Sequence, residues 1–179
     1  MSPTTYVLGL GNVLMGDDGF GPAVVHAFES TYAVPPDVEV IDLGTPGLDL
    51  APWLIDMPRV VLVDTIKTKL RPGALRIYDK ADLLRYVPSV RVGPHDPGVK
   101  EALLALEFAG RAPRELTLIG AVPARTEVAL ELSAPLKAAI PHAVAAVADA
   151  LRRWGVTLEG PASSFSPLAL IGGPLRSLR

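Results

Sequence analysis

The sequence has no cysteine among its 179 residues and carries a formal net charge of only −2. The lack of cysteine excludes disulfide bonds, thiolate metal sites and a cysteine nucleophile, and it is typical of the cytoplasm, where we expect the protein to act. The weak negative charge provides no basic surface for nucleic acid or an anionic membrane. No apolar run approaches the ~20 residues that span a bilayer. We therefore expect neither nucleic acid nor a membrane as a partner. The N-terminus does not resemble a signal peptide.

The composition indicates a folded protein, because 49% of the residues are hydrophobic and 20% are charged. The length suits one domain with a substantial core. We place that domain at residues 1–155. Residues 156–179 collect Gly, Pro and Ser and lose all periodicity, so they are interpreted as a C-terminal tail. We expect a monomer.

Predicted strands alternate with predicted helices along nearly the whole chain. The apolar and β-branched runs that indicate strands are residues 6–10, 38–43, 59–65, 73–79 (nearer an edge) and 115–122. Helical spacing is found at residues 20–32, in a short segment before residue 58, after the turn at residues 95–98, and at residues 133–155 with a bend near Pro141. This order predicts an α/β three-layer sandwich with a mostly parallel twisted sheet.

Unusual polar residues lie in loops that follow the predicted strands. In a parallel sheet, ligands bind beyond the carboxyl ends of the strands, so these loops are where a site is expected. The loops hold Asn12, Asp17 and Asp18; Asp42, Gly44 and Gly47; Asp64; and His95 with Asp96.

Gly9 and Gly11 match the start of the dinucleotide-binding pattern G-x-G-x-x-G. The third glycine is missing, because Leu14 stands in its place. Asp17 and Asp18 would also stand near the start of the following helix and repel a pyrophosphate. The sequence therefore argues against a nucleotide at this turn.

Asp18, Asp64 and His95 together would offer two carboxylates and an imidazole. Borderline divalent metals such as nickel, zinc, iron and cobalt accept such a set. The alternative is structural: Asp17 or Asp18 caps the first helix, Asp64 caps the turn after its strand, and His95 is an ordinary loop histidine. Helix caps are common, so spacing alone leaves both interpretations open.

Four segments, in order, resemble the nickel-iron hydrogenase maturation endopeptidases. The segment "GLGNVLMGDDGFG" is similar to their opening signature, "DLGTPG" to their second element and "VLVDTI" to their central strand. "SVRVGPHDPGVKEALLAL" is similar to their histidine loop and helix. The resemblance extends from about Tyr6 to Trp154. It implies a phosphorylase/hydrolase-like fold.

The resemblance further implies an endopeptidase that removes a C-terminal extension from the hydrogenase large-subunit precursor after nickel insertion. By motif position, the metal-contacting residues are Asp18, Asp64 and His95, whereas Asp17 is the less favoured neighbour. Asp42 lies in an element that is thought to influence cleavage or substrate choice. We also expect Gly19 and Gly21 to let the substrate peptide pass close to the helix start.

The mechanism and the catalytic residue stay open at this point, with Asp18, Asp42 and Asp64 as candidates and Asp17 as another candidate base. Neither a Gly-x-Ser-x-Gly elbow nor a His-Glu-x-x-His helix is present. The metal either activates a water as a Lewis acid or is nickel that the precursor carries as a recognition tag; we expect the second. Two other functions compete with this one: a nickel-binding maturation chaperone that cuts nothing, and a hydrolase related to peptidyl-tRNA hydrolase, which begins with a similar "GLGN" strand.

Overall fold

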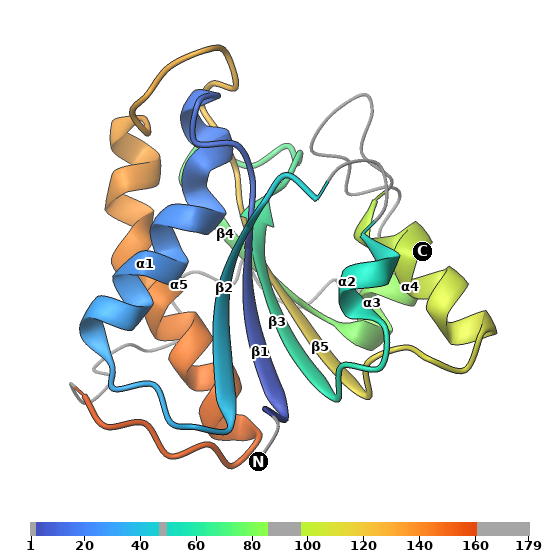
Figure 1. The fold of residues 1–179 in the computed structure, drawn as a ribbon. Helices are drawn as coiled ribbons and strands as arrows, with labels where there is room; N and C mark the ends of the chain where they lie inside the picture. The colour runs from blue at the N-terminus through green and yellow to red at the C-terminus, as the bar shows by residue number, and fades with distance from the viewer. Residues whose placement is uncertain (1–2, 47–49, 86–97, 161–179) are drawn as a thin grey trace, which may run out of the picture.

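The computed structural model describes residues 3–46, 50–85 and 98–160, which fold around one five-stranded sheet (Figure 1). The strands are β1 (Thr5–Leu10), β2 (Val38–Gly44), β3 (Arg59–Thr65), β4 (Leu75–Asp79) and β5 (Glu115–Ala121). Their order is β2-β1-β3-β5-β4, and all neighbours are parallel except the antiparallel pair β4 and β5. The predicted, mostly parallel sheet is confirmed, as is the edge position of the strand in residues 73–79.

Helices cover both faces of the sheet, which confirms the three-layer architecture (Figure 1). On one face lie α1 (Phe20–Thr31) and α5 (Ala134–Arg153); on the other lie α2 (Ala51–Leu54), α3 (Lys80–Arg85) and α4 (Val99–Phe108). A short 3-10 helix, η1 (Gly16–Gly19), leads into α1. The sequence analysis did not predict α3 or η1. Pro141 lies inside α5 without ending it.

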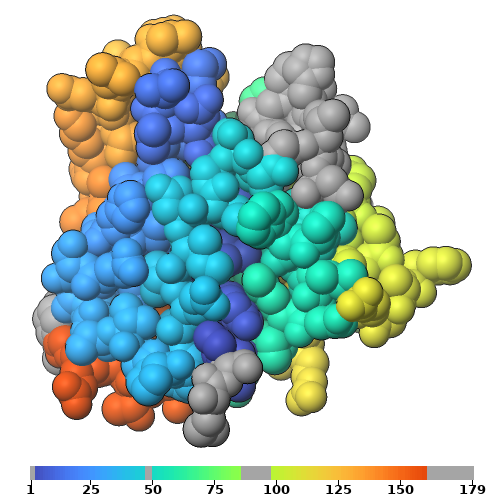
Figure 2. Space-filling view, viewed as in Figure 1, coloured from blue at the N-terminus to red at the C-terminus, as the bar shows by residue number. Residues whose placement is uncertain are grey.

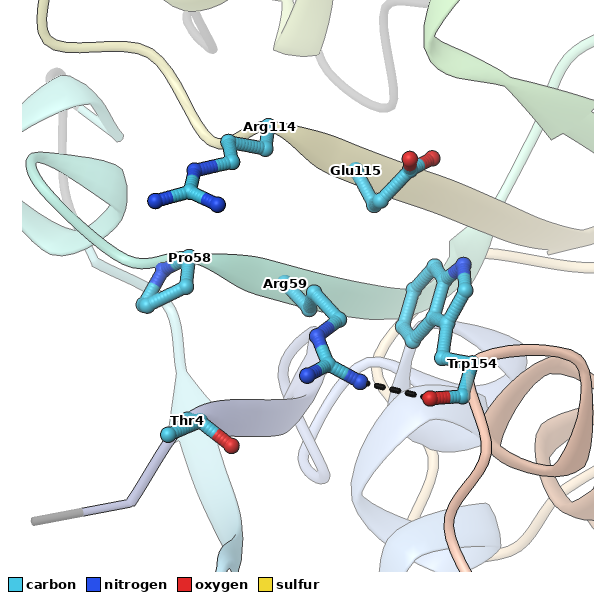
Figure 3. Close-up of a pocket in the computed structure, with 6 residues that line it drawn as sticks. All are labelled: Thr4, Pro58, Arg59, Arg114, Glu115 and Trp154. Atoms are coloured by element: carbon cyan, nitrogen blue, oxygen red, sulfur yellow. Dashed lines mark hydrogen bonds between the residues drawn. The ribbon is translucent and has the colours of Figure 1, made fainter.

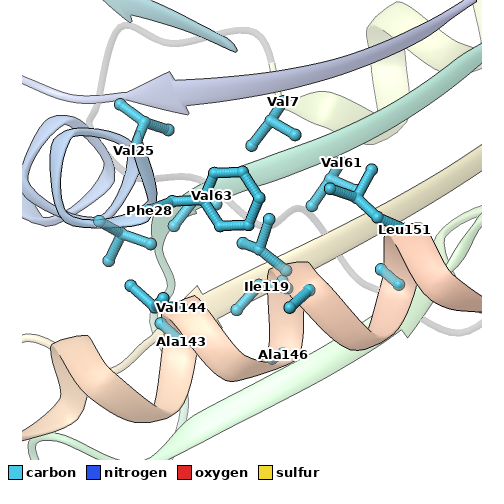
Figure 4. Close-up of a cluster of buried hydrophobic side chains, with 14 of the residues drawn as sticks. Val7, Val25, Phe28, Val61, Val63, Ile119, Ala143, Val144, Ala146 and Leu151 are labelled. Atoms are coloured by element: carbon cyan, nitrogen blue, oxygen red, sulfur yellow. The ribbon is translucent and has the colours of Figure 1, made fainter. Parts of the chain in front are cut away.

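The central strand β3 separates two hydrophobic cores, because its side chains alternate between the two faces. Val61 and Val63 pack with the residues of α1 and α5, as Figure 4 shows. Val60 and Leu62 pack on the opposite face, toward α2, α3 and α4. Burial on both faces explains why this strand is a continuous β-branched run instead of an alternating one.

Residues just beyond Gly155 still pack on the domain. Val156 is buried in the same core as α1 and α5, and Leu158 packs against it. The backbone N–H of Ala33 donates to the carbonyl of Glu159 at 3.0 Å. Residues 161–179 of the expected tail lie outside the described residues, so the division of the chain at residue 155 stays a prediction.

In the described ranges, no helix has the length and apolar character needed to cross a membrane.

Candidate active site

Asp18 and Asp64 both lie at the carboxyl edge of the sheet, where the sequence predicted a site. Asp64 is the next-to-last residue of β3. Asp18 lies in η1, which follows the neighbouring strand β1 and contacts β3. The Oδ2 atom of Asp18 accepts a hydrogen bond from the backbone N–H of Asn12 at 2.8 Å, which holds the carboxylate beside the end of β1.

Asp64 is buried, with only 6% of its surface exposed. Its Oδ1 accepts a hydrogen bond from the backbone N–H of Thr65 at 2.6 Å. Alternation along β3 places the Asp64 side chain on the face of Leu62, which is the face covered by α2, α3 and α4. A buried carboxylate is stable only with polar partners around it. Buried carboxylates of this kind are typical of functional sites.

Asp17, the neighbour of Asp18, is fully buried and occupied by hydrogen bonds. Its Oδ2 accepts from the backbone N–H of Ala124 (2.7 Å) and of Arg125 (3.0 Å) and from the Ser133 hydroxyl (2.8 Å). Its Oδ1 accepts from the backbone N–H of Ser133 at 2.6 Å. Burial raises the pKa of Asp17, but the hydrogen bonds from Ser133, Arg125 and Ala124 outweigh this effect and lower the pKa below its ordinary value of 3.8.

These contacts give Asp17 a structural role that sequence spacing did not reveal. Ser133 is the N-cap residue of α5, so Asp17 joins η1 to the start of a helix more than 100 positions away. The N-cap of α1 is Gly19, which makes no side-chain capping bond. Neither Asp17 nor Asp18 is therefore the N-cap residue of α1, and the Asp17 carboxylate accepts the N–H of the α5 N-cap instead.

Asp42 points away from Asp64. Its Oδ2 lies 3.5 Å from Nε2 of His26 on α1, and its Oδ1 accepts from the backbone N–H of Gly44 at 3.0 Å. Val40, two residues earlier on β2, packs on the α1 face. The sheet therefore lies between the Asp42 side chain and that of Asp64, and the structure does not bring these two candidates together.

His95 falls in residues 86–97, outside the described residues, as does Asp96; Gly47 also lies outside them. Within residues 3–46, 50–85 and 98–160, no group of three His, Cys, Asp or Glu side chains is placed to hold a metal ion. The complete set of Asp18, Asp64 and His95 therefore stays a prediction, of which the structure describes the two carboxylates.

Two glycines at the junction of η1 and α1 allow close packing of the chain on itself. A Cβ atom on Gly21 would lie 2.1 Å from the carbonyl oxygen of Leu10 and 2.5 Å from that of Val63. α1 thus begins directly against the ends of β1 and β3. A Cβ atom on Gly19 would lie 3.1 Å from Cα of Val13. The expectation that Gly19 and Gly21 make room for a substrate peptide is wrong, because protein backbone already fills that space.

The opposite, amino edge of the sheet contains a pocket of about 480 Å³ (Figure 3). Its walls come from the starts of β1, β3 and β5 and from the end of α5: Thr4, Pro58, Arg59, Arg114, Glu115 and Trp154. Nη1 of Arg59 donates to the carbonyl of Trp154 at 2.7 Å, so this guanidinium satisfies the end of α5. The pocket lies at the far end of the strands from Asp18 and Asp64.

Comparison with known proteins identifies the family. The family model described as hydrogenase maturation protease matches residues 22–150. The hydrogenase 2 maturation protease of Escherichia coli is 34% identical over 154 residues, covering 84% of this chain and 92% of that protein. The hydrogenase expression/formation protein HupD of Rhizobium leguminosarum is 34% identical over 158 residues, covering 88% of this chain and 78% of HupD.

A solved structure agrees with these sequence matches. The hydrogenase maturating endopeptidase HybD from Escherichia coli superimposes with a TM-score of 0.77 at 31% identity, covering 89% of this chain and 99% of HybD. The likeness in fold therefore extends over nearly the whole of that endopeptidase. Together with the family match, it shows that the chain belongs to the hydrogenase maturation protease family, a family of endopeptidases.

Proposed function

We propose that this protein removes the C-terminal extension of a nickel-iron hydrogenase large-subunit precursor after nickel insertion. The observation that carries the proposal is the placement of two carboxylates at the carboxyl edge of the sheet. Two neighbouring strands, β1 and β3, lead to Asp18 and Asp64 there, whereas the adjacent Asp17 is fully engaged elsewhere. The relatives named above are maturation proteins of hydrogenases, which supports a hydrogenase precursor as the substrate.

The metal in this proposal is nickel, and the substrate brings it. Asp18, Asp64 and His95 would complete the coordination of an ion that the precursor already holds. Two carboxylates and an imidazole suit a borderline divalent metal, yet they compete poorly with thiolates for nickel. A chain without cysteine can therefore contact the ion without removing it. Recognition of this kind explains how cleavage can wait for nickel insertion.

The position of Asp42 favours Asp18 and Asp64 as the residues closest to the chemistry. The Asp42 side chain lies near His26, on the face of the sheet that α1 covers. The Asp64 side chain lies on the opposite face. Membership of a protease family favours cleavage over both alternatives, the nickel chaperone and the hydrolase related to peptidyl-tRNA hydrolase. We further propose that the protein acts as a monomer in the cytoplasm.

Mass spectrometry of a nickel-loaded precursor mixed with this protein tests the proposal. We expect the precursor to lose the mass of its C-terminal peptide, and the released peptide to appear separately. The Asp64→Asn variant is the matched control, because it keeps the shape of the side chain and removes its charge. A nickel-loaded precursor that binds the parent protein but keeps its C-terminal peptide would identify the chaperone instead.

A further inference from the structure

Two segments of the carboxyl edge expose four apolar side chains. Val13 and Leu14, in the loop after β1, are 53% and 55% exposed. Val128 and Leu130, in the segment between β5 and α5, are 81% and 82% exposed. Among the described residues these are half of the large apolar side chains that are exposed. We call these four residues the apolar rim.

Backbone hydrogen bonds hold the two halves of the apolar rim side by side. The N–H of Gly16 donates to the carbonyl of Ala129 at 2.8 Å, and the N–H of Ala129 donates to the carbonyl of Leu14 at 3.1 Å. Val128 and Leu130 flank the bonded residue Ala129. Figures 1 and 2 show the two segments together at the top of the molecule, in dark blue and gold. The two segments that carry the rim therefore lie side by side.

The segment that carries Val128 and Leu130 is held in place before any partner arrives. Asp17 binds its start through the N–H groups of Ala124 and Arg125 and its end through Ser133. Glu131 adds an ion pair with Lys137 of α5, with 2.6 Å between Oε2 and Nζ. A surface fixed in this way loses little conformational entropy on binding, which favours its use in recognition.

The apolar rim is continuous with the candidate active site. Val13 follows Asn12, whose N–H binds the Asp18 carboxylate, and Leu14 is bonded to the same segment that Asp17 anchors. A protease that cuts one bond of a folded protein must hold that protein beside its site. Contiguous exposed apolar side chains next to a site are typical of protein interaction surfaces.

We propose that the apolar rim is a docking surface for an apolar segment of the precursor protein near its cleavage point. This inference rests on the proposed function, since it names the surface that receives the same substrate. It also assigns a role to Asp17. By holding the segment between β5 and α5 against η1, Asp17 positions the rim relative to Asp18.

The test compares the double variant Val128→Ser/Leu130→Ser with the parent protein. Precursor affinity is measured by calorimetry, and kcat and KM are measured from release of the C-terminal peptide. We expect the Kd and KM to rise roughly tenfold or more with kcat unchanged, because two apolar contacts are lost only from the complex. The conservative variant Val128→Ile/Leu130→Met should restore parental values.

The matched control is Leu104→Ser/Phe108→Ser on α4. These two side chains are 47% and 97% exposed and lie one helical turn apart, away from the rim. We expect this control to bind and process the precursor as the parent does. Equal affinity of the rim variant and the parent would overturn the docking role while leaving the proposed function standing.

Three further outcomes distinguish a failure of the docking role from a failure of the proposed function. A rim variant that binds the precursor normally but loses a concentration-dependent dimer in sedimentation would show that the rim pairs with a second copy instead. A parent protein that binds the precursor without cutting it would contradict the proposed function, and the affinities would still decide the docking role. A parent protein that neither binds nor cuts would overturn both.

Discussion

The two edges of the sheet use charged side chains in opposite ways. At the amino edge, Arg59 satisfies the carbonyl of Trp154 and thereby completes the end of a helix beside a pocket. At the carboxyl edge, Asp64 near the end of β3 and Asp18 in η1, which follows the neighbouring strand β1, lie next to an exposed apolar surface. The presence of a pocket at the amino edge therefore does not make that edge the better candidate for an active site. In a parallel sheet the carboxyl ends of the strands are where ligands bind.

The same contrast recurs within the acidic pair at the carboxyl edge. Asp17 is buried and receives four hydrogen bonds that connect η1 with the segment before α5. Asp18 is partly exposed and lies beside the end of β1. We therefore expect Asp17 to stabilise the carboxyl edge and Asp18 to face the substrate. Substitutions at each position can break this division.

The largest effect is expected from removing the proposed metal-contacting groups at the site itself. Asp18→Asn, Asp64→Asn and His95→Ala should each slow precursor processing by about 100-fold or more, which corresponds to ~2.7 kcal/mol of transition-state stabilisation. The asparagine variants keep an oxygen acceptor for the Asn12 and Thr65 N–H groups, so they should remain folded. Peptide release measured by mass spectrometry gives the rates, and circular dichroism checks the fold. Parental processing by any one variant would remove that residue from the site.

Asp17→Asn should chiefly reduce stability. An asparagine places an NH₂ group toward one of the donors that now meet carboxylate oxygens, so at least one hydrogen bond is lost and a donor is left without a partner. We expect the free energy of unfolding to fall by about 2–4 kcal/mol. Urea denaturation measures it, with Asp18→Asn as the matched control that should lose less. A loss at Asp18 larger than at Asp17 would reverse the division of roles.

The pH dependence of stability provides a smaller, independent signature of Asp17. Its pKa in the folded protein lies below the ordinary 3.8, so the deprotonated carboxylate stabilises the fold above that value. This contribution should be lost as the pH falls below about 4 toward the lowered pKa. Denaturation at about pH 5, 4 and 3 should therefore show a steeper loss for the parent than for Asp17→Asn. Parallel curves for the two proteins would contradict the lowered pKa.

The smallest effect is expected at the amino edge. Arg59→Ala removes the hydrogen bond to the Trp154 carbonyl and should cost about 1–2 kcal/mol of stability. It should leave kcat and KM for the precursor unchanged, because the residue lies at the far end of the strands from Asp18. Thermal unfolding and processing rates measure the two quantities. A large rise in KM would show that the amino-edge pocket takes part in recognition.

Local pattern predicted most of the fold but little of the contact network. β-branched runs revealed β3 and β5, and helical spacing revealed α1 and α5, because these signals depend on neighbouring residues only. The role of Asp17 depends on Ala124, Arg125 and Ser133, more than 100 positions away, so no spacing rule could reveal it. The antiparallel direction of β4 was likewise hidden, since a strand's composition does not fix its direction.

Gly21 shows how a motif can indicate a local constraint without indicating its cause. Its place in the motif correctly indicated close backbone approach at the start of a helix. The approaching backbone belongs to Leu10 and Val63 of the protein itself, not to a substrate. A sequence shows that space is required at a position, whereas only the fold shows what fills it.

The most direct test of the proposed activity asks whose nickel is needed. The protein is preloaded with nickel, desalted and mixed with precursor that has never received metal; a parallel sample uses nickel-loaded precursor and metal-free protein. Release of the C-terminal peptide is followed by mass spectrometry. An ion shared by two proteins adds binding free energy only when it is present, and ~1.4 kcal/mol changes occupancy tenfold. We predict release from the loaded precursor alone. Efficient release from the metal-free precursor would contradict recognition of substrate-borne nickel and favour a conventional metalloprotease.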